Sequence, residues 1–166
     1  MRRFPLVLFL VLLAGAALFI TATAGQLPEI VAVHFDAAGH ANGYMTRAGC
    51  RSFMLTLSIA APALIVIATA LLPRLLPASM INIPNRDYWL AAERAPQSLA
   101  FLGEQGIWFG CIFVVFITAV DWMLVRANAV VPPSFPTTLF IATLMFFFCA
   151  IGIWAARMFR RFRAPR

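Results

Sequence analysis

The segment from His34 to Tyr44 holds both histidines of the chain and one of its six acidic residues. Its spacing, H-x-D-x-x-x-H, would let the Asp36 carboxylate hold the His34 ring in one tautomer, with His40 approaching after a turn. Three such groups could bind zinc or another divalent ion, or take part in acid–base catalysis. The pattern favours a structural interpretation, in which Asp36 caps a turn and His34 bonds a backbone carbonyl.

The residues around this segment alternate as they would in an extended strand. One face would carry the apolar side chains Val31, Val33 and Phe35, and the other would carry Ala32, His34 and Asp36. Gly39 and the pair Asn42-Gly43 offer two places where a positive φ costs little, so the chain can turn back there. We therefore expect a shaped loop, whose binding or structural motif is His34, Phe35, Asp36, Gly39, Gly43 and Tyr44.

Asp121 is the one ionisable residue inside the long apolar runs of the chain. A charge at membrane depth is costly, which makes such a residue a functional-site hypothesis. Because Asp121 lies near the end of its run, about one turn from Arg126, we expect it to reach the headgroup region or to pair with that arginine. A buried polar contact with the His34–Tyr44 loop, or a role in a proton relay, is the alternative.

Composition indicates the environment in which these side chains lie. Of the 166 residues, 63% are hydrophobic and 11% are charged, against about 45–50% and about 25% in soluble domains. The net charge of +7 comes from thirteen arginines scattered between apolar blocks, which is typical of the anchoring of membrane helices and not of nucleic-acid binding. The expected partner is therefore the lipid bilayer.

Four segments are long and apolar enough to cross a hydrocarbon core, which takes about 20 residues of helix. They are residues 4–24, 53–72, 107–125 and 137–156. Backbone amides in lipid have no water to bond, so all four are expected to be helices. The prediction is an all-α integral membrane protein, residues 1–166 forming a single membrane domain, with loops at 25–52 and 73–106.

Arginine asymmetry predicts the orientation of these spans in the cell membrane. With the N-terminus and the C-terminus in the cytoplasm, ten arginines lie inside and three lie outside, the three being Arg47, Arg51 and Arg126. Loop 25–52 is then extracytoplasmic and loop 73–106 is cytoplasmic. An alternative for the first span is a cleaved secretory signal, because Met1-Arg-Arg precedes an apolar run that ends in Ala22-Thr-Ala24.

The cytoplasmic loop contains a second motif, formed by Asn82, Pro84, Tyr88 and Trp89. Asn85 is expected to cap a short helix that lies on the membrane, with Tyr88 and Trp89 as interfacial aromatic residues. The three cysteines form no C-x-x-C pair, and we assign no disulfide, metal or cofactor to them. Nucleotide-binding and hydrolase motifs are absent from the sequence.

Part of this sequence resembles a known bacterial family. Leu27-Pro28, Val33-His34-Phe35-Asp36, Gly39 and Gly43-Tyr44, placed directly after a first span, look like the domain of unknown function that opens the Sdp immunity protein (SdpI-like) family. The segment from Asn82 to Leu90 is similar to the N-x-P-x-x-x-Y-W segment of small standalone members. The resemblance implies a multi-pass bacterial membrane protein, and in the best-known relative it implies immunity to a secreted toxin coupled to sequestration of a transcriptional repressor.

These observations predict a non-enzymatic protein of the cell envelope that binds or senses an extracytoplasmic ligand or peptide, or supports a partner membrane protein. The alternative is a small membrane enzyme or an ion-coupled transporter, which would use His34, Asp36, His40 and Asp121. A transporter with four spans would be expected to form a homo-oligomer.

Overall fold

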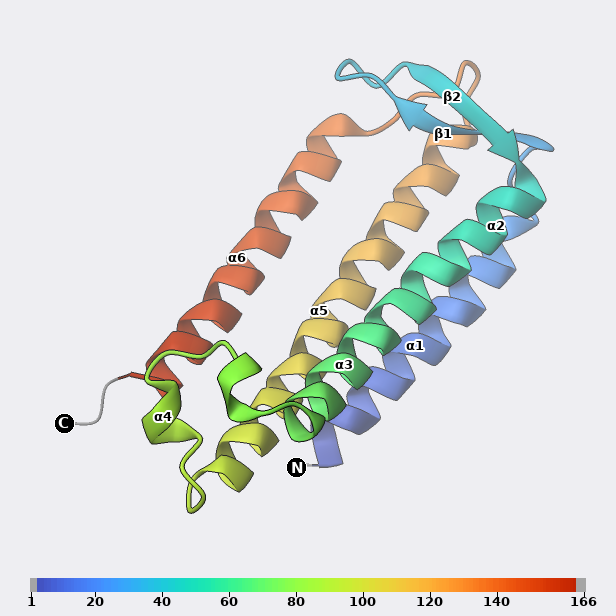
Figure 1. Cartoon of the computed structure of the whole chain (residues 1–166). Helices are drawn as coiled ribbons and strands as arrows, with labels where there is room; N and C mark the ends of the chain where they lie inside the picture. Colours follow the sequence, from blue (N-terminus) through green and yellow to red (C-terminus); the bar gives the residue numbers. More distant parts are fainter. Residues whose placement is uncertain (1–2, 164–166) are drawn as a thin grey trace.

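The computed structural model describes residues 3–163, which are mostly helical. Figure 1 shows long helices running side by side, with a small hairpin across one end of the bundle and a short irregular segment at the other. Within residues 3–163, four helical spans are long and apolar enough to cross a membrane, as predicted: α1 (Arg3–Ala24), the continuous helix from Arg47 to Leu75, α5 (Ala95–Asn128) and α6 (Thr137–Arg161).

The helices extend further than their apolar runs. The continuous second helix begins at Arg47 and not at residue 53, and α5 begins at Ala95 and not at residue 107. Residues 95–106 of the expected loop 73–106 are therefore helical. The length of an uncharged apolar run indicates only the part of a helix that crosses hydrocarbon, and the helix itself can continue into a polar environment. Pro96 is compatible with this longer helix because it lies in the first turn of α5, where a missing N–H costs nothing.

The second span changes its helical winding at its centre. It consists of α2 (Arg47–Leu55), a π-helical turn η1 (Thr56–Ala60) and α3 (Ala61–Leu75). Pro62 follows this turn and has no N–H to donate to the carbonyl four residues earlier. The amide of Ala61 instead bonds the carbonyl of Thr56, five residues back, so the wider turn accommodates the proline.

Helix α5 is the centre of the bundle and contacts α1, α3 and α6. Two of its glycines permit close approach: a Cβ on Gly106 would overlap the Thr69 side chain, and one on Gly110 would lie 2.7 Å from Val66 and 2.8 Å from Phe9. Small residues at such crossings let helices pack tightly in lipid. In contrast, α6 has no buried residue among those described.

The hairpin consists of β1 (Ile30–Phe35) and β2 (Ala41–Thr46), which pair antiparallel with Ile30 opposite Thr46. It lies across the ends of the helices (Figure 1). Val31 is fully buried, and Val33 and Phe35 pack against the same apolar cluster as α1, α2 and α5, as the alternation predicted. Thr46 ends β2 and caps α2, because its hydroxyl accepts a bond from Gly49 N at 3.1 Å.

Candidate functional site

Asp36 forms the turn of the hairpin. Its Oδ1 accepts hydrogen bonds from the backbone N–H groups of Ala38 and His40, both at 2.9 Å. The backbone N–H of Gly39 also donates to the Asp36 carbonyl at 3.0 Å. The bond from the His40 amide is the largest of several causes that lower the pKa of Asp36 below its ordinary value. The structural interpretation of this residue is confirmed.

The side-chain partner of Asp36 is His40, and the expected pair with His34 is wrong. His40 Nδ1 lies 3.3 Å from Asp36 Oδ2, in an exposed position. His34 instead lies opposite Gly43, and the register of the hairpin shifts on either side of it. Among residues 3–163, no three His, Cys, Asp or Glu side chains form a group that could hold a metal, so His34, Asp36 and His40 do not converge as ligands.

Gly39 connects the hairpin turn to the loop between α5 and α6. Its φ of +88° confirms the expected turn, and a Cβ at this position would lie 2.7 Å from the carbonyl oxygen of Phe135. The Phe135 amide donates to the Gly39 carbonyl at 2.9 Å, and the Phe135 ring stacks on Phe35 with centroids 5.0 Å apart. Two motif residues therefore serve to hold this loop.

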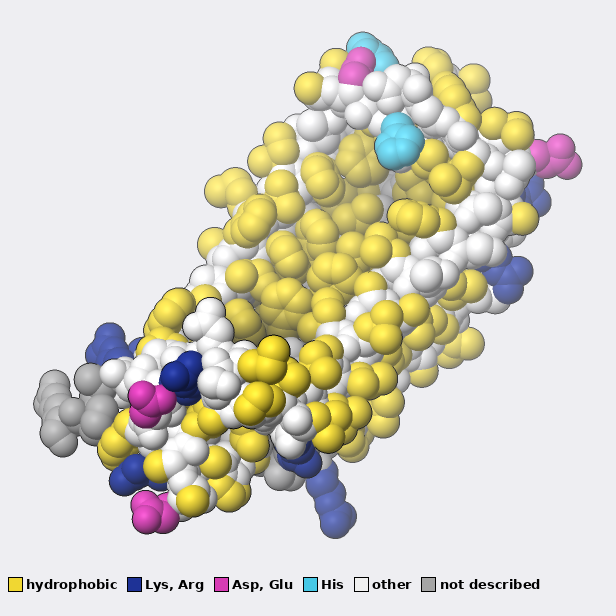
Figure 2. All heavy atoms as spheres, viewed as in Figure 1, with side chains coloured by type: hydrophobic (Ala, Val, Ile, Leu, Met, Phe, Trp, Pro, Cys, Tyr) yellow, Lys and Arg dark blue, Asp and Glu magenta, His cyan; other side chains and the backbone are white. Residues whose placement is uncertain are grey.

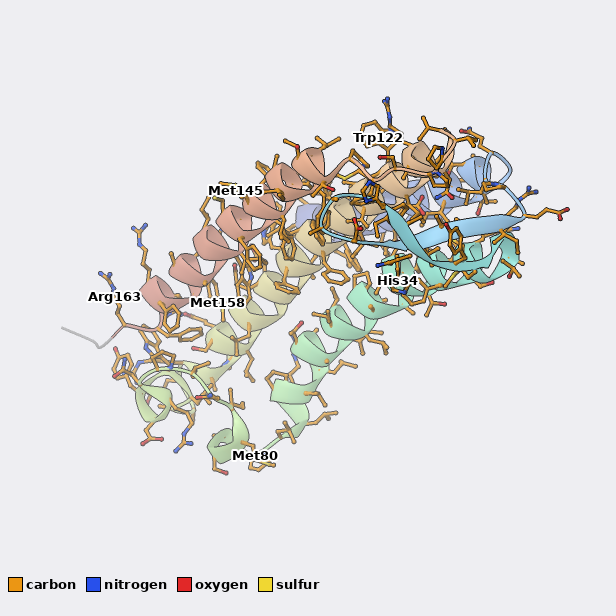
Figure 3. The ribbon with its side chains drawn as sticks, turned by 90° about the horizontal axis from the view of Figure 1, so that it is seen from above. His34, Met80, Trp122, Met145, Met158 and Arg163 are labelled. Carbon is orange, nitrogen blue, oxygen red and sulfur yellow. The ribbon has the colours of Figure 1, made fainter. Side chains whose placement is uncertain are left out.

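Gly43 has a different role from the one expected. It lies within β2 opposite His34, and the turn predicted at Asn42-Gly43 is wrong, because Gly39 is the one described glycine with a positive φ. A Cβ on Gly43 would lie 2.9 Å from both Cβ and Cδ2 of His34. Because Gly43 has no side chain, it leaves space for the His34 ring. Figure 3 shows His34 on the side of the hairpin that faces the second helical span.

Asn128, which sequence reasoning missed, holds β1 on the bundle. Its Oδ1 accepts from Ala32 N at 2.8 Å, and its Nδ2 donates to Ala32 O at 2.9 Å and to Leu124 O at 3.0 Å. Ala32 is fully buried, so this amide satisfies backbone groups that water cannot reach. Asn128 makes the hydrogen bonds to the edge of β1 that a third strand would otherwise make. The only signal in the sequence is an amide side chain directly after a long apolar run.

The other edge of the hairpin is open. Since Ala32 directs both backbone groups to Asn128, away from β2, the opposing residue Tyr44 directs its own N–H and C=O away from β1. The β2 side chains alternate in exposure, and Tyr44 is 57% exposed between the exposed Asn42 and Thr46. Ile30, on β1, is 59% exposed. The sheet has two strands among the described residues, so nothing in it covers this edge.

Asp121 is buried within the bundle, and the expected pair with Arg126 is not formed. It is 2% exposed, and its Oδ2 has no hydrogen-bond partner in the described part of the chain. Arg126 is exposed and lies over the Trp122 ring, 5.3 Å from its centroid. Five residues of helix turn the side chain by about 140°, so positions 121 and 126 face different directions.

The surroundings of Asp121 are apolar. It shares a helix face with Ile117, Leu124 and Val125, which belong to the cluster beneath the hairpin. The thiol of Cys50, in α2, lies within electrostatic range of its carboxylate. Seven residues, or about 10 Å of helix, separate it from Asn128. It is therefore a solitary buried polar group beneath the hairpin.

The second motif packs around the end of α6. Segment 76–94 contains η2 (Ala78–Met80) and α4 (Arg86–Trp89). Asn85 precedes α4 but its side chain does not cap it; with a φ of 53°, it donates to the carbonyl of the buried Phe162 at 2.8 Å. Trp89 Nε1 donates to Arg163 O at 3.1 Å, and Ser98 Oγ to Trp89 O at 2.8 Å.

The remaining members of this motif are less constrained. Tyr88 lies beneath the guanidinium of Arg94, 4.0 Å from the ring centroid. Asn82 and Pro84 are exposed, between and beside the buried residues Ile81 and Ile83. The motif therefore forms a folded cap on α5 and α6, and the short helix expected after Asn85 is α4.

One family model matches the chain: the model described as "Domain of unknown function (DUF1648)" matches residues 9–59. The match covers most of α1, the whole hairpin, α2 and nearly all of η1. No curated protein and no solved structure matches the chain. The resemblance drawn from His34, Asp36, Gly39 and Tyr44 is thereby confirmed: over residues 9–59 the chain is similar to the domain found in SdpI-like membrane proteins.

Proposed function

We propose that this multi-pass membrane protein is not an enzyme and that its hairpin binds an extended peptide segment of an extracytoplasmic ligand or partner protein. The open edge of β2 carries the proposal. A peptide could add a strand there through the free N–H and C=O of Tyr44, while the exposed Tyr44 ring contacts its side chains. Sensing, signalling or immunity to a toxin would be the cellular form of such binding.

The division of the motif supports this role. Phe35, Asp36, Gly39 and Gly43 are engaged in the turn, the stacking on Phe135 and the space for His34. Tyr44 has an exposed side chain, and the ladder pattern directs its backbone groups away from β1. A rigid support with an exposed aromatic residue loses little conformational entropy on binding.

The distribution of arginines supports an extracytoplasmic hairpin in the cytoplasmic membrane. At the end opposite the hairpin, the described residues include Arg3, Arg74, Arg86, Arg94, Arg157, Arg160, Arg161 and Arg163. At the hairpin end they include Arg47, Arg51 and Arg126. Arg2 and Arg166, also predicted inside, lie outside the described residues. We propose that both termini are cytoplasmic.

This orientation can be tested by cysteine labelling in a cysteine-free background. Ala37 is exposed in the hairpin turn and Ala92 is exposed in segment 76–94. A cysteine at position 37 should react with a membrane-impermeant maleimide in intact cells. A cysteine at position 92 should react only after lysis, and the reverse pattern would overturn the proposed orientation.

The binding role is tested by two substitutions at Tyr44 in a strain that lacks the chromosomal gene. Tyr44→Ala removes the ring and should weaken the function partly, whereas Tyr44→Pro also removes the N–H of the open edge and should weaken it further. Leu139→Ala, on the exposed apolar face of α6, is the matched control. Full complementation by Tyr44→Pro, with the protein present at its normal level, would refute strand addition.

Asp121 gives specific support to the alternative function, an ion-coupled transporter. Its buried carboxylate oxygen Oδ2 lacks a hydrogen-bond partner among the described residues. A carboxylate that binds and releases a proton or a cation during transport would need such an unoccupied oxygen. Asp121→Asn preserves shape and removes the charge. The binding proposal predicts that this variant still complements, and a transporter predicts complete loss of activity with normal expression.

A further inference from the structure

A cavity of about 350 Å³ lies between α3, α5 and α6 at the end of the bundle opposite the hairpin. Segment 76–94 closes it through Met80, Ile81 and Ile83. Most of its wall is apolar, with Leu102 on α5 and Trp154 on α6 among its residues. Figure 2 shows a hollow of hydrophobic side chains on this face of the molecule, above segment 76–94. Its volume is within the range of small-molecule sites, about 300–1,000 Å³.

Gln105 introduces one hydrogen-bonding group into this apolar wall. Gln105 is one of the lining residues, is 1% exposed, and its Nε2 has no hydrogen-bond partner within residues 3–163. A primary amide has two N–H donors, and a buried donor normally has a partner. An occupant with an acceptor oxygen would supply the partner that Gln105 Nε2 lacks among the described residues.

The walls around Gln105 are held in place. The backbone carbonyl of Gln105 accepts a bond from Trp154 Nε1 at 2.9 Å, which fixes α6 against α5. Next to it, Gly106 packs directly on Thr69 of α3, where a Cβ would not fit. The cavity is consequently preformed, which reduces the entropy lost on binding.

The mouth of the cavity faces the surroundings of the helices. Leu72 is 49% exposed and Met80 is 65% exposed, and both contribute to its rim. Arg74 follows the lining residue Pro73, and Arg157 precedes the lining residue Met158; both arginines are exposed. Apolar walls, one buried donor and exposed arginines next in sequence to two lining residues are the chemistry that an acyl chain, its carbonyl group and a negatively charged headgroup would need.

We propose that this cavity binds an anionic phospholipid, whose acyl chain fills the apolar part and whose ester carbonyl accepts a hydrogen bond from Gln105 Nε2. The headgroup would lie at the rim beside Arg74 and Arg157. This site is separate from the hairpin and does not depend on the function proposed for it.

The proposal is tested by photolabelling of the full chain in detergent with a phosphatidylglycerol that carries a diazirine in its acyl chain. Labelling should be saturable and should map to cavity residues such as Leu102 and Met158. Gln105→Leu removes the donor at similar volume and should reduce this labelling about three- to tenfold, the equivalent of one hydrogen bond. Trp108→Phe is the matched control, because Trp108 Nε1 is also buried without a described partner but does not line this cavity.

A second variant, Ala68→Phe, fills the cavity and leaves Gln105 in place, and it should also lose the label. Thermal unfolding of each variant verifies that it is folded. Displacement of the label by unlabelled phosphatidylglycerol supports the proposal, whereas displacement by oleate alone would overturn the phospholipid in favour of a free fatty acid. Equal labelling of the exposed residues Met145 and Phe146 on α6, unchanged by Gln105→Leu, would overturn the site itself.

Discussion

The two ends of the bundle are closed in different ways. At the hairpin end, the contacts are directional bonds to backbone groups, from Asn128 to Ala32 and from Phe135 to Gly39. At the α4 end, aromatic rings and a guanidinium group pack around Phe162, with Trp89 6.0 Å away between centroids and Arg161 4.2 Å above Trp89. Ring stacking also occurs at the hairpin end, between Phe35 and Phe135, and side chains also bond backbone carbonyls at the α4 end, so the two closures differ in the share of each kind of contact. The cavity beside Gln105 lies at the second end.

The largest expected effect is at Gly39. Substitution to Ala would place a Cβ against the Phe135 carbonyl and would disfavour the φ of +88°. We expect a loss of about 2–3 kcal/mol in the free energy of unfolding, measured by denaturation in detergent. Gly25→Ala is the control, because a Cβ added at Gly25 would have no described atom within 4 Å. Equal effects of the two changes would contradict a backbone-specific closure.

Asn128→Ala should have the next largest effect. It removes the amide and leaves the buried N–H and C=O of Ala32 without their partner, which costs about 1–3 kcal/mol. Hydrogen exchange at Ala32 should accelerate while exchange in α3 is unchanged. Asn42→Ala, at an exposed amide on the hairpin, should leave exchange at Ala32 as in the wild type.

A smaller effect is expected at Asn85, at the opposite end. Asn85→Gly keeps the φ of 53° accessible but removes the hydrogen bond to Phe162 O. This loss should lower the free energy of unfolding by about 1 kcal/mol. Asn85→Ala adds a left-handed strain of about 1 kcal/mol more. Thermal unfolding of the two variants separates the loss of the hydrogen bond from the backbone strain. Identical melting temperatures would show that backbone strain at Asn85 is unimportant.

The smallest effect is the pH dependence of the hairpin turn. The bond from the His40 amide, the largest cause, lowers the pKa of Asp36 from 3.8 in the folded state. Asp36 therefore stabilises the turn above its unfolded pKa, and this contribution is lost as the pH falls through the lower, folded pKa. Amide exchange at Ala38 and His40 should increase in that acidic range. Asp36→Asn should abolish the pH dependence, and its persistence in this variant would exclude Asp36 as the titrating group.

Much of the hairpin could be predicted because its determinants are local. The alternation of Val31, Val33 and Phe35 and the positive φ of Gly39 depend on residues a few positions apart. The role of Gly43 could not be predicted, because it depends on where the shifted register places His34. The bond between Asn128 and Ala32 joins residues 96 positions apart, a separation at which no local pattern exists.

By itself, the sequence determined the four helical spans, since length and apolarity of a segment decide whether a helix can cross hydrocarbon. It also determined that Asp36 ends a strand in a turn, because the bonds that do so lie within four residues. The tertiary structure alone decided that Asp121 is buried, that His40 and not His34 meets Asp36, and that Gln105 faces a cavity. These outcomes depend on the rotation of one helix against another and on the register of two strands, which are set by packing between distant parts of the chain.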